Sequence, residues 1–123
     1  MSVYLTFFTY TKDSMRSMVE HPEDREEAAR KVIEAAGGQL LSFYWMLGEH
    51  DGLAIYEVPD APAAAGVSAA ISASGRISDL NTILLLSSVE VRRSLELAKV
   101  IAAQYQPPGG FSEEWRAGYD VLG

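Results

Sequence analysis

The sequence has no cysteine among its 123 residues. Disulfide bonds, thiolate metal sites and a cysteine nucleophile are therefore excluded, and the absence agrees with a reducing compartment. Long apolar runs are also missing, since the most apolar stretch, residues 83–86, is far too short to span a bilayer. The first residues, Met1 to Tyr4, contain no basic or apolar leader. We therefore expect a cytoplasmic protein without a membrane segment.

Positive charge is scarce. The chain has 10 Lys and Arg against 17 Asp and Glu, a formal net charge of −7, and the acidic residues are spread along its length. An acidic chain without a basic stripe is poorly suited to nucleic acid or to an anionic membrane surface. Its 48% hydrophobic content is typical of a folded protein, and its length fits one domain.

The motifs of several large enzyme classes are absent: there is no nucleophile elbow, phosphate loop or dinucleotide fingerprint. The two histidines, His21 and His50, are far apart in the sequence, and neighbouring side chains such as Glu49 to Asp51 seldom converge on one ion. We predict no metal site, and no residue pattern indicates a flavin, a haem or another cofactor.

Hydrophobic periodicity predicts an α+β domain. A short turn is expected near 14–19, and the remaining elements are strands over 3–10, 39–47, 53–58 and 76–86 and helices over 23–36, 60–74 and 87–105. The order β-α-β-β-α-β is that of the ferredoxin-like fold, a four-stranded antiparallel sheet with two helices on one face. A further helix then follows at the C-terminal side.

Both faces of the predicted sheet are apolar. In strand 39–47 strict alternation predicts one face with Leu41, Phe43, Trp45 and Leu47 and another with Leu40, Tyr44 and Met46. Two helices cover only one face, and leaving the other in water costs about 25 cal/mol per Å² of apolar surface. We therefore expect a homo-oligomer, with a two-fold pairing as the commonest solution, although the last helix could cover part of that face.

Residues 43–60 (FYWMLGEHDGLAIYEVPD) resemble the signature of the GYD domain family, as do residues 27–31 leading to Gly37-Gly38. Where the family motif has tyrosine, this chain has His50. The resemblance spans about residues 2–95. It implies a ferredoxin-like domain over 1–95 that pairs as a dimeric α/β barrel, with a pocket between sheet and helices. Residues 96–123 would pack on the same domain or on a neighbouring subunit.

Two candidate catalytic residues, His50 and Asp51, lie in a turn bounded by glycines. A histidine beside carboxylates can transfer protons near neutral pH, although a solvated turn explains the pattern as well. Candidate ligand-binding residues are the aromatic side chains and the arginine that opens the last strand: Tyr10, Tyr44, Trp45, Tyr56 and Arg76. The alternative role for the aromatic residues is core and interface.

Two functional hypotheses follow. The first is an oligomeric small-molecule-binding protein, or a cofactor-independent enzyme that acts on a small apolar or aromatic compound by general acid/base chemistry. The second is a non-catalytic oligomeric accessory protein, in which the aromatic faces are interfaces and the tail residues Phe111, Trp115 and Tyr119 dock on a neighbour. The sequence leaves open which is correct.

Overall fold

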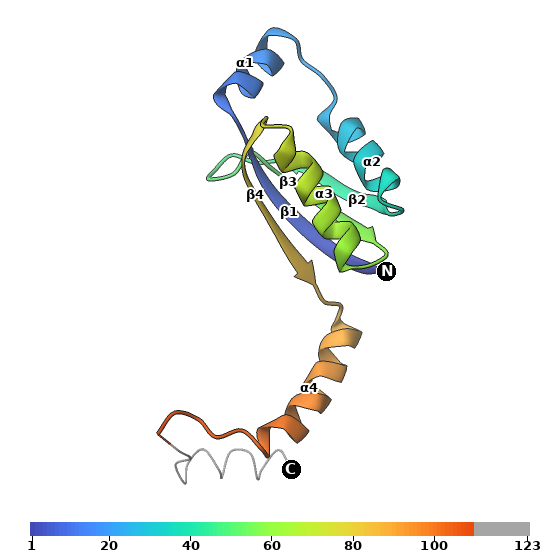
Figure 1. The fold of residues 1–123 in the computed structure, drawn as a ribbon, viewed down its shortest axis with the longest axis vertical. Helices are drawn as coiled ribbons and strands as arrows, with labels where there is room; N and C mark the ends of the chain where they lie inside the picture. Colours follow the sequence, from blue (N-terminus) through green and yellow to red (C-terminus); the bar gives the residue numbers. More distant parts are fainter. Residues whose placement is uncertain (110–123) are drawn as a thin grey trace. The chain divides into compact units, whose positions relative to one another are not determined.

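The computed structural model describes residues 1–109 and divides the chain into two compact units, Met1–Leu85 and a second that begins at Leu86. The first unit contains four strands and three helices. These are β1 (Ser2–Tyr10), α1 (Lys12–Glu20), α2 (Arg25–Ala35), β2 (Gln39–Trp45), β3 (Gly52–Val58), α3 (Ala61–Ala73) and β4 (Ile77–Leu85) (Figure 1). The second unit contains α4 (Ser88–Ala102).

The four strands form one antiparallel sheet in the order β2-β3-β1-β4. β1 lies in the middle, where it pairs with β3 on one side and β4 on the other. This order, with α2 between β1 and β2 and α3 between β3 and β4, is the ferredoxin-like arrangement. The predicted α+β fold class is therefore confirmed.

The segment after β1 is more regular than predicted. Instead of a short turn it forms α1, a nine-residue helix whose N-cap is Thr11. The Thr11 hydroxyl accepts a hydrogen bond from the Ser14 backbone N–H, which satisfies one of the free donors of the first turn. Asp24 and Asp60 cap α2 and α3 in the same manner.

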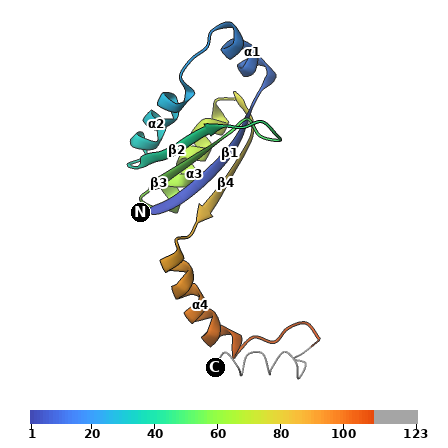
Figure 2. The ribbon, with the colours of Figure 1, turned by 180° about the vertical axis from the view of Figure 1, so that it is seen from behind.

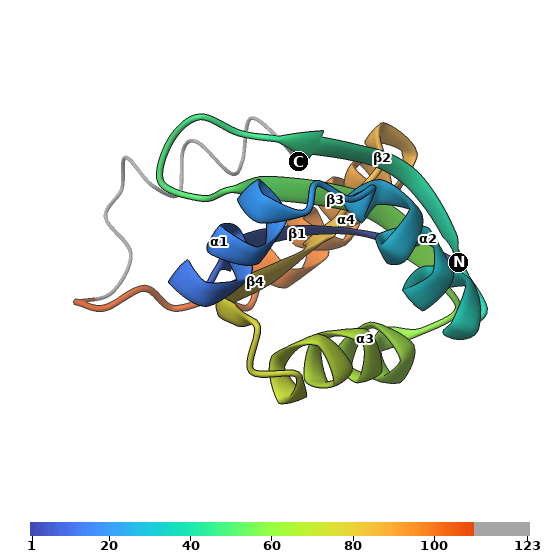
Figure 3. The ribbon, with the colours of Figure 1, turned by 90° about the horizontal axis from the view of Figure 1, so that it is seen from above.

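The helices α2 and α3 lie on the same face of the sheet, with α3 in front of the strands in Figure 1 and behind them in Figure 2. α2 contacts β2 and β3, and α3 contacts β3 and β4 (Figure 3). The buried core lies between these layers. Its members come from both layers, the sheet and the helices: Tyr4, Phe8, Ile33, Leu40, Ala54, Tyr56, Val58, Ala64 and Val67.

A β-bulge in β2 changes which of its side chains point toward the helices. Leu40 pairs with Tyr56 and Ser42 pairs with Ile55, so that Leu41 is an extra residue in the ladder. The bulge places Leu40 and Phe43 on the same, helix-covered face. The predicted strict alternation, which set these two residues on opposite faces, is therefore wrong, because one inserted residue shifts the phase of every side chain before it.

The sheet face turned away from the helices, here called the outer face, is rich in apolar side chains. It carries alternate residues of the strands, namely Val3, Leu5, Phe7, Tyr44, Leu53, Ile55, Ile83 and Leu85. Tyr44 is 64% exposed and Ile83 42% exposed. Within Met1–Leu85 no helix covers this face, as the two-sided pattern predicted.

α4 begins with a capping box. The Ser87 hydroxyl accepts from the Glu90 N–H, and the Glu90 carboxylate accepts from the Ser87 N–H. The backbone hydrogen bond from Ser87 lowers the pKa of Glu90 below its ordinary value. No helix within residues 1–109 is long and apolar enough to cross a membrane. The predicted docking of Phe111, Trp115 and Tyr119 lies outside the described residues.

Candidate functional site

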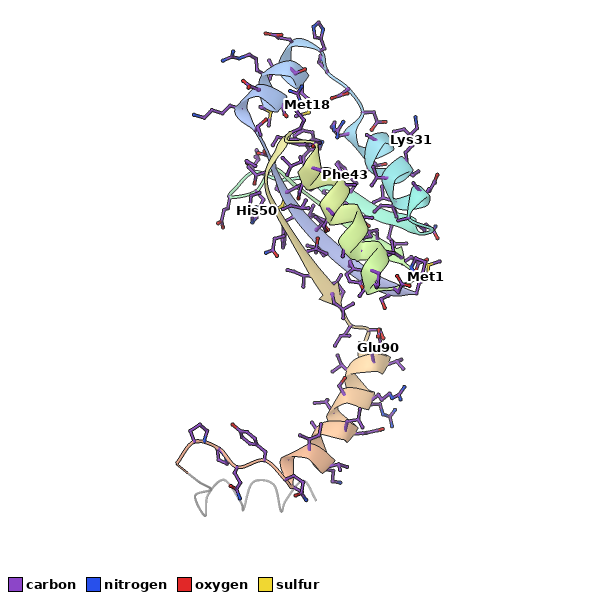
Figure 4. The ribbon with its side chains drawn as sticks, in the orientation of Figure 1. Met1, Met18, Lys31, Phe43, His50 and Glu90 are labelled. Atoms are coloured by element: carbon purple, nitrogen blue, oxygen red, sulfur yellow. The ribbon has the colours of Figure 1, made fainter. Side chains whose placement is uncertain are left out.

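A cavity of about 480 Å³ lies between the sheet and the helices α1, α2 and α3. Its walls are mainly apolar, and this volume falls within the range of small-molecule sites. The apolar lining comes from every layer of the first unit: Phe8, Met18, Ala28, Ala29, Val32, Ile33, Phe43, Ala54, Val67, Ala70, Ile71, Ile77 and Leu80. Figure 4 labels two of these residues, Met18 on α1 and Phe43 on β2.

Four hydroxyl groups form a continuous row, and three of them, those of Thr6, Tyr56 and Ser68, belong to residues that line the cavity. The Thr6 hydroxyl lies 2.8 Å from the Tyr56 hydroxyl and 2.9 Å from that of Thr82, which in turn lies 3.0 Å from the Ser68 hydroxyl. The row joins β3, β1, β4 and α3. Tyr56 is only 1% exposed and Thr6 is also buried, so these hydrogen bonds satisfy polar groups that water does not reach.

Tyr10 and Arg25 form the second polar feature of the wall. Arg25 Nε donates a hydrogen bond of 3.4 Å to the Tyr10 hydroxyl oxygen, and the guanidinium lies 5.8 Å from the centre of the tyrosine ring. Burial raises the pKa of Tyr10, against the smaller lowering effect of Arg25. Tyr10 is therefore a neutral phenol at physiological pH and keeps a proton to donate. A Glu23 carboxylate oxygen lies 3.7 Å from a terminal nitrogen of the Arg25 guanidinium.

Arg76 lies at the same end of the cavity. Its carbonyl oxygen accepts hydrogen bonds from the Thr11 backbone N–H at 3.2 Å and from the Ser14 hydroxyl at 2.8 Å. These contacts fix the backbone of Arg76 beside the end of β1, where Tyr10 is located. Among residues 1–109, no carboxylate lies within ion-pair distance of the Arg76 guanidinium.

Three of the five predicted ligand-binding residues line the cavity: Tyr10, Tyr56 and Arg76. Tyr44 lies on the outer face. Trp45, which is 50% exposed, packs against Tyr10 with ring centres 5.4 Å apart but does not line the cavity.

Sequence reasoning missed Thr6 and Arg25, both of which line the cavity. A signal for Thr6 was present, because it alternates in phase with Tyr4, Phe8 and Tyr10 on β1. Arg25 is the first residue of α2 after its cap, Asp24. Its contact with Tyr10, fifteen positions earlier in the chain, depends on how the α1–α2 connection folds back.

His50 and Asp51 lie outside the cavity lining. The His50 ring stacks on Phe7 with centres 5.2 Å apart, and its Nδ1 lies 3.3 Å from the Thr9 hydroxyl and 3.6 Å from an Asp79 carboxylate oxygen. These contacts place the imidazole on the outer face, in the loop after β2 (Figure 4).

The Asp51 side chain has a structural contact, since its carboxylate accepts the Tyr10 backbone N–H at 2.8 Å. This hydrogen bond ties the β2–β3 loop to the end of β1. In the part of the chain that the structure describes, no three His, Asp or Glu side chains are grouped so as to hold a metal ion.

Comparison with known protein families decides the classification. The family model of the GYD domain matches residues 4–95, which include the sheet except the first two residues of β1, the helices α1, α2 and α3, and the start of α4. The chain belongs to the GYD domain family. The resemblance predicted from residues 43–60 is therefore confirmed.

The comparisons with curated proteins and with solved structures are less informative than the family model. No curated protein matches the chain. Among solved structures, an uncharacterized NIPSNAP domain protein from Burkholderia xenovorans is similar, with 10% sequence identity and a TM-score of 0.46. The alignment covers 72% of this chain and 95% of that one.

Proposed function

We propose that this GYD domain protein is a homo-oligomeric small-molecule-binding protein, and that its apolar or aromatic ligand occupies the cavity between the sheet and the helices. The observation that carries the proposal is the cavity itself, about 480 Å³ with mainly apolar walls and a few polar groups grouped in two places. Pockets that bind small organic molecules share this composition, in which apolar walls supply affinity and few polar groups fix orientation.

Packing supports a ligand in this position. Protein interiors are close-packed, whereas this cavity is partly open and leaves apolar side chains beside the core in contact with solvent, which is unfavourable. The space lies beside large side chains such as Phe8, Phe43 and Ile33. An apolar ligand would restore the van der Waals contacts that these side chains lack on their cavity side.

The polar groups of the wall are suited to binding a ligand and orienting it. They comprise the hydroxyl row, the neutral phenol of Tyr10, the side chains of Arg25, Arg76 and Glu23, and three serines, Ser14, Ser17 and Ser74. General acid/base chemistry through His50 would require a ligand on the outer face, because His50 packs against Phe7 there. We therefore propose binding, and not proton transfer by His50 and Asp51, as the activity of the cavity.

The outer face supports the oligomeric part of the proposal. Pairing this face with a second copy would bury Leu5, Tyr44, Ile83 and their neighbours, and it gives the two-fold assembly that is commonest among homo-oligomers. The same observation favours the second candidate function, a non-catalytic accessory protein in which this interface is the functional surface.

A neutral fluorescent compound, N-phenylnaphthylamine, tests binding in the cavity. The wild-type protein should enhance its fluorescence in a saturable titration. Ala29→Leu adds three carbon atoms to the cavity wall and should weaken binding about tenfold or more, because the added carbons and the probe compete for the same space.

Ala35→Leu is the matched control, because Ala35 is exposed on the same helix and does not line the cavity. This variant should bind the probe as the wild type does. Equal loss of affinity in both variants, or saturable binding that neither variant weakens, would place the probe elsewhere and contradict the proposed function.

A further inference from the structure

The main polar groups around the cavity lie at its two ends, and this arrangement indicates which class of ligand would bind there. This inference rests on the proposed function, in which a small molecule occupies the cavity. One end is formed by Tyr10, Arg25 and Arg76. The other is formed by the hydroxyl row of Tyr56, Thr6, Thr82 and Ser68. The two ends differ in charge, in burial and in the hydrogen bonds that they offer.

The first end is cationic. Among the side chains that line the cavity here, Arg25 and Arg76 contribute two positive charges and Glu23 one negative charge, so this part of the lining has a net charge of +1. The Asp51 carboxylate, which accepts the Tyr10 backbone N–H, lies outside the lining. The Tyr10 hydroxyl already accepts a hydrogen bond from Arg25, and this contact leaves its own proton free for another acceptor. An anionic oxygen would receive charge-assisted hydrogen bonds from the arginines and a further hydrogen bond from Tyr10.

The second end is neutral. Its four hydroxyl groups have four protons, and three hydrogen bonds within the row use three of them. When the three hydrogen bonds all run in the same direction, the fourth O–H proton is at one end of the row, and reversing all of them moves it to the other end. Such a row can donate to a neutral ligand oxygen or accept from a ligand hydroxyl, whereas a charge at this buried position would be costly.

The spacing between the two ends sets the length of the ligand. Tyr10 and Thr6 are four residues apart on β1, which is about 13 Å along a strand. Phe8 lies between them on the same face and pairs with Leu80 of β4, while Ala54 of β3 pairs with Thr6. The middle of the cavity thus offers apolar contact only.

We propose that the ligand is an elongated, apolar monoanion with a carboxylate or phenolate bound between Arg25, Arg76 and Tyr10. A neutral hydroxyl or carbonyl group at its far end binds the row of Thr6, Tyr56, Thr82 and Ser68.

Three related compounds test both ends by isothermal titration calorimetry. The reference probe is a hydroxynaphthoate with its carboxylate and hydroxyl on opposite rings. Its amide keeps the shape and loses the charge, and the parent naphthoate loses the hydroxyl. The wild-type protein should bind the amide about tenfold more weakly than the reference, and the parent naphthoate about fivefold more weakly.

Substitutions at each end of the cavity test which residues cause the preference for the carboxylate and which cause the preference for the hydroxyl. Arg76→Gln and Arg25→Gln should each reduce the preference for the carboxylate over the amide, whereas Arg76→Lys should largely retain it. Ser68→Ala should remove most of the preference for the hydroxyl and leave the charge preference intact. Arg16→Gln, on an exposed residue of α1 outside the cavity lining, is the charge control and should change neither preference. A thermal melt of each variant verifies that it is folded.

The outcomes separate this inference from the proposed function. If all three compounds bind equally and Ala29→Leu blocks them, the cavity binds small molecules but the two-ended selection is refuted. A charge preference that survives both glutamine variants would likewise overturn it. If none of the compounds binds, the inference fails, and binding of N-phenylnaphthylamine then decides separately whether the cavity function stands.

Discussion

The guanidinium of Arg25 lies over the ring of Tyr10, and its Nε donates a hydrogen bond of 3.4 Å to the Tyr10 hydroxyl oxygen. The contact joins the first turn of α2 to the end of β1, and both residues line the cavity. Burial nevertheless has the larger effect on the phenol, so the pKa of Tyr10 is raised from its ordinary value of 10.0.

Tyr10→Phe should therefore remove one ionisation above pH 10.0 from the ultraviolet tyrosinate titration of the folded protein. In the wild type, the unfolded chain ionises Tyr10 before the native state does. The part of the free energy of unfolding that depends on Tyr10 is fully present below pH 10.0 and should fall as the pH rises above that value. The Tyr10→Phe variant should lose less stability over the same rise in pH. Loss of an ionisation below pH 10.0 would show that burial does not dominate.

Arg25→Gln should raise the pKa of Tyr10 further, because the hydrogen bond and charge of Arg25 both favour the phenolate. The same absorbance titration measures this shift. A lowered pKa in the variant would mean that Arg25 acts chiefly by burying the ring.

Two glycine-to-alanine changes should have opposite effects on stability. A Cβ at Gly38 would collide with the Glu57 carbonyl oxygen and lie 2.8 Å from the buried Val58 side chain, and we expect a loss of about 3 kcal/mol. Gly66 lies in α3 with open space around it, and Gly66→Ala should add about 1 kcal/mol through helix propensity. Urea denaturation measures both, and a neutral Gly38→Ala would refute the close approach.

The order of elements could be predicted from the sequence because alternation in the strands and capping residues at the helices are local signals. The β-bulge at Leu41 could not. Nothing in residues 39–47 marks one position as extra, because the bulge is set by pairing with β3. That one insertion explains why Leu40 and Phe43, which alternation predicts on opposite faces, lie on the same face.

The candidate site was predictable only in part, for a related reason. Tyr10, Tyr56 and Arg76 could be selected by residue type and by their place in or next to strands. Tyr44 belongs to a strand as well, but the choice between the two faces depends on where the helices pack. The contact of Arg25 with Tyr10 arises from tertiary structure, and no local pattern encodes it.

His50→Ala should leave the affinity for N-phenylnaphthylamine within about twofold of the wild type, because His50 contacts Phe7 and Thr9 on the other side of the sheet. The fluorescence titration of the cavity variants provides the comparison. A tenfold loss of affinity would mean that the ligand reaches the outer face, and it would restore His50 as a candidate binding or catalytic residue.

Ile83→Glu should convert the proposed oligomer to monomers, since it places a charge on the apolar outer face, directly opposite Leu5 of β1. Sedimentation equilibrium gives the mass. Val19→Glu is the control, because Val19 is 73% exposed on α1 and away from the sheet. A wild-type protein that sediments as a monomer, or an Ile83→Glu variant that keeps the oligomeric mass, would contradict pairing through this face.

The most direct test of the cavity as the ligand site is methyl nuclear magnetic resonance on the wild-type protein with N-phenylnaphthylamine bound. Methyl groups on the two sides of the sheet provide internal markers: Ile33, Val67 and Leu80 line the cavity, whereas Leu5, Leu53 and Ile83 lie on the outer face. The account predicts intermolecular nuclear Overhauser effects from the probe to the first set. Effects confined to Leu5, Leu53 and Ile83 would contradict it.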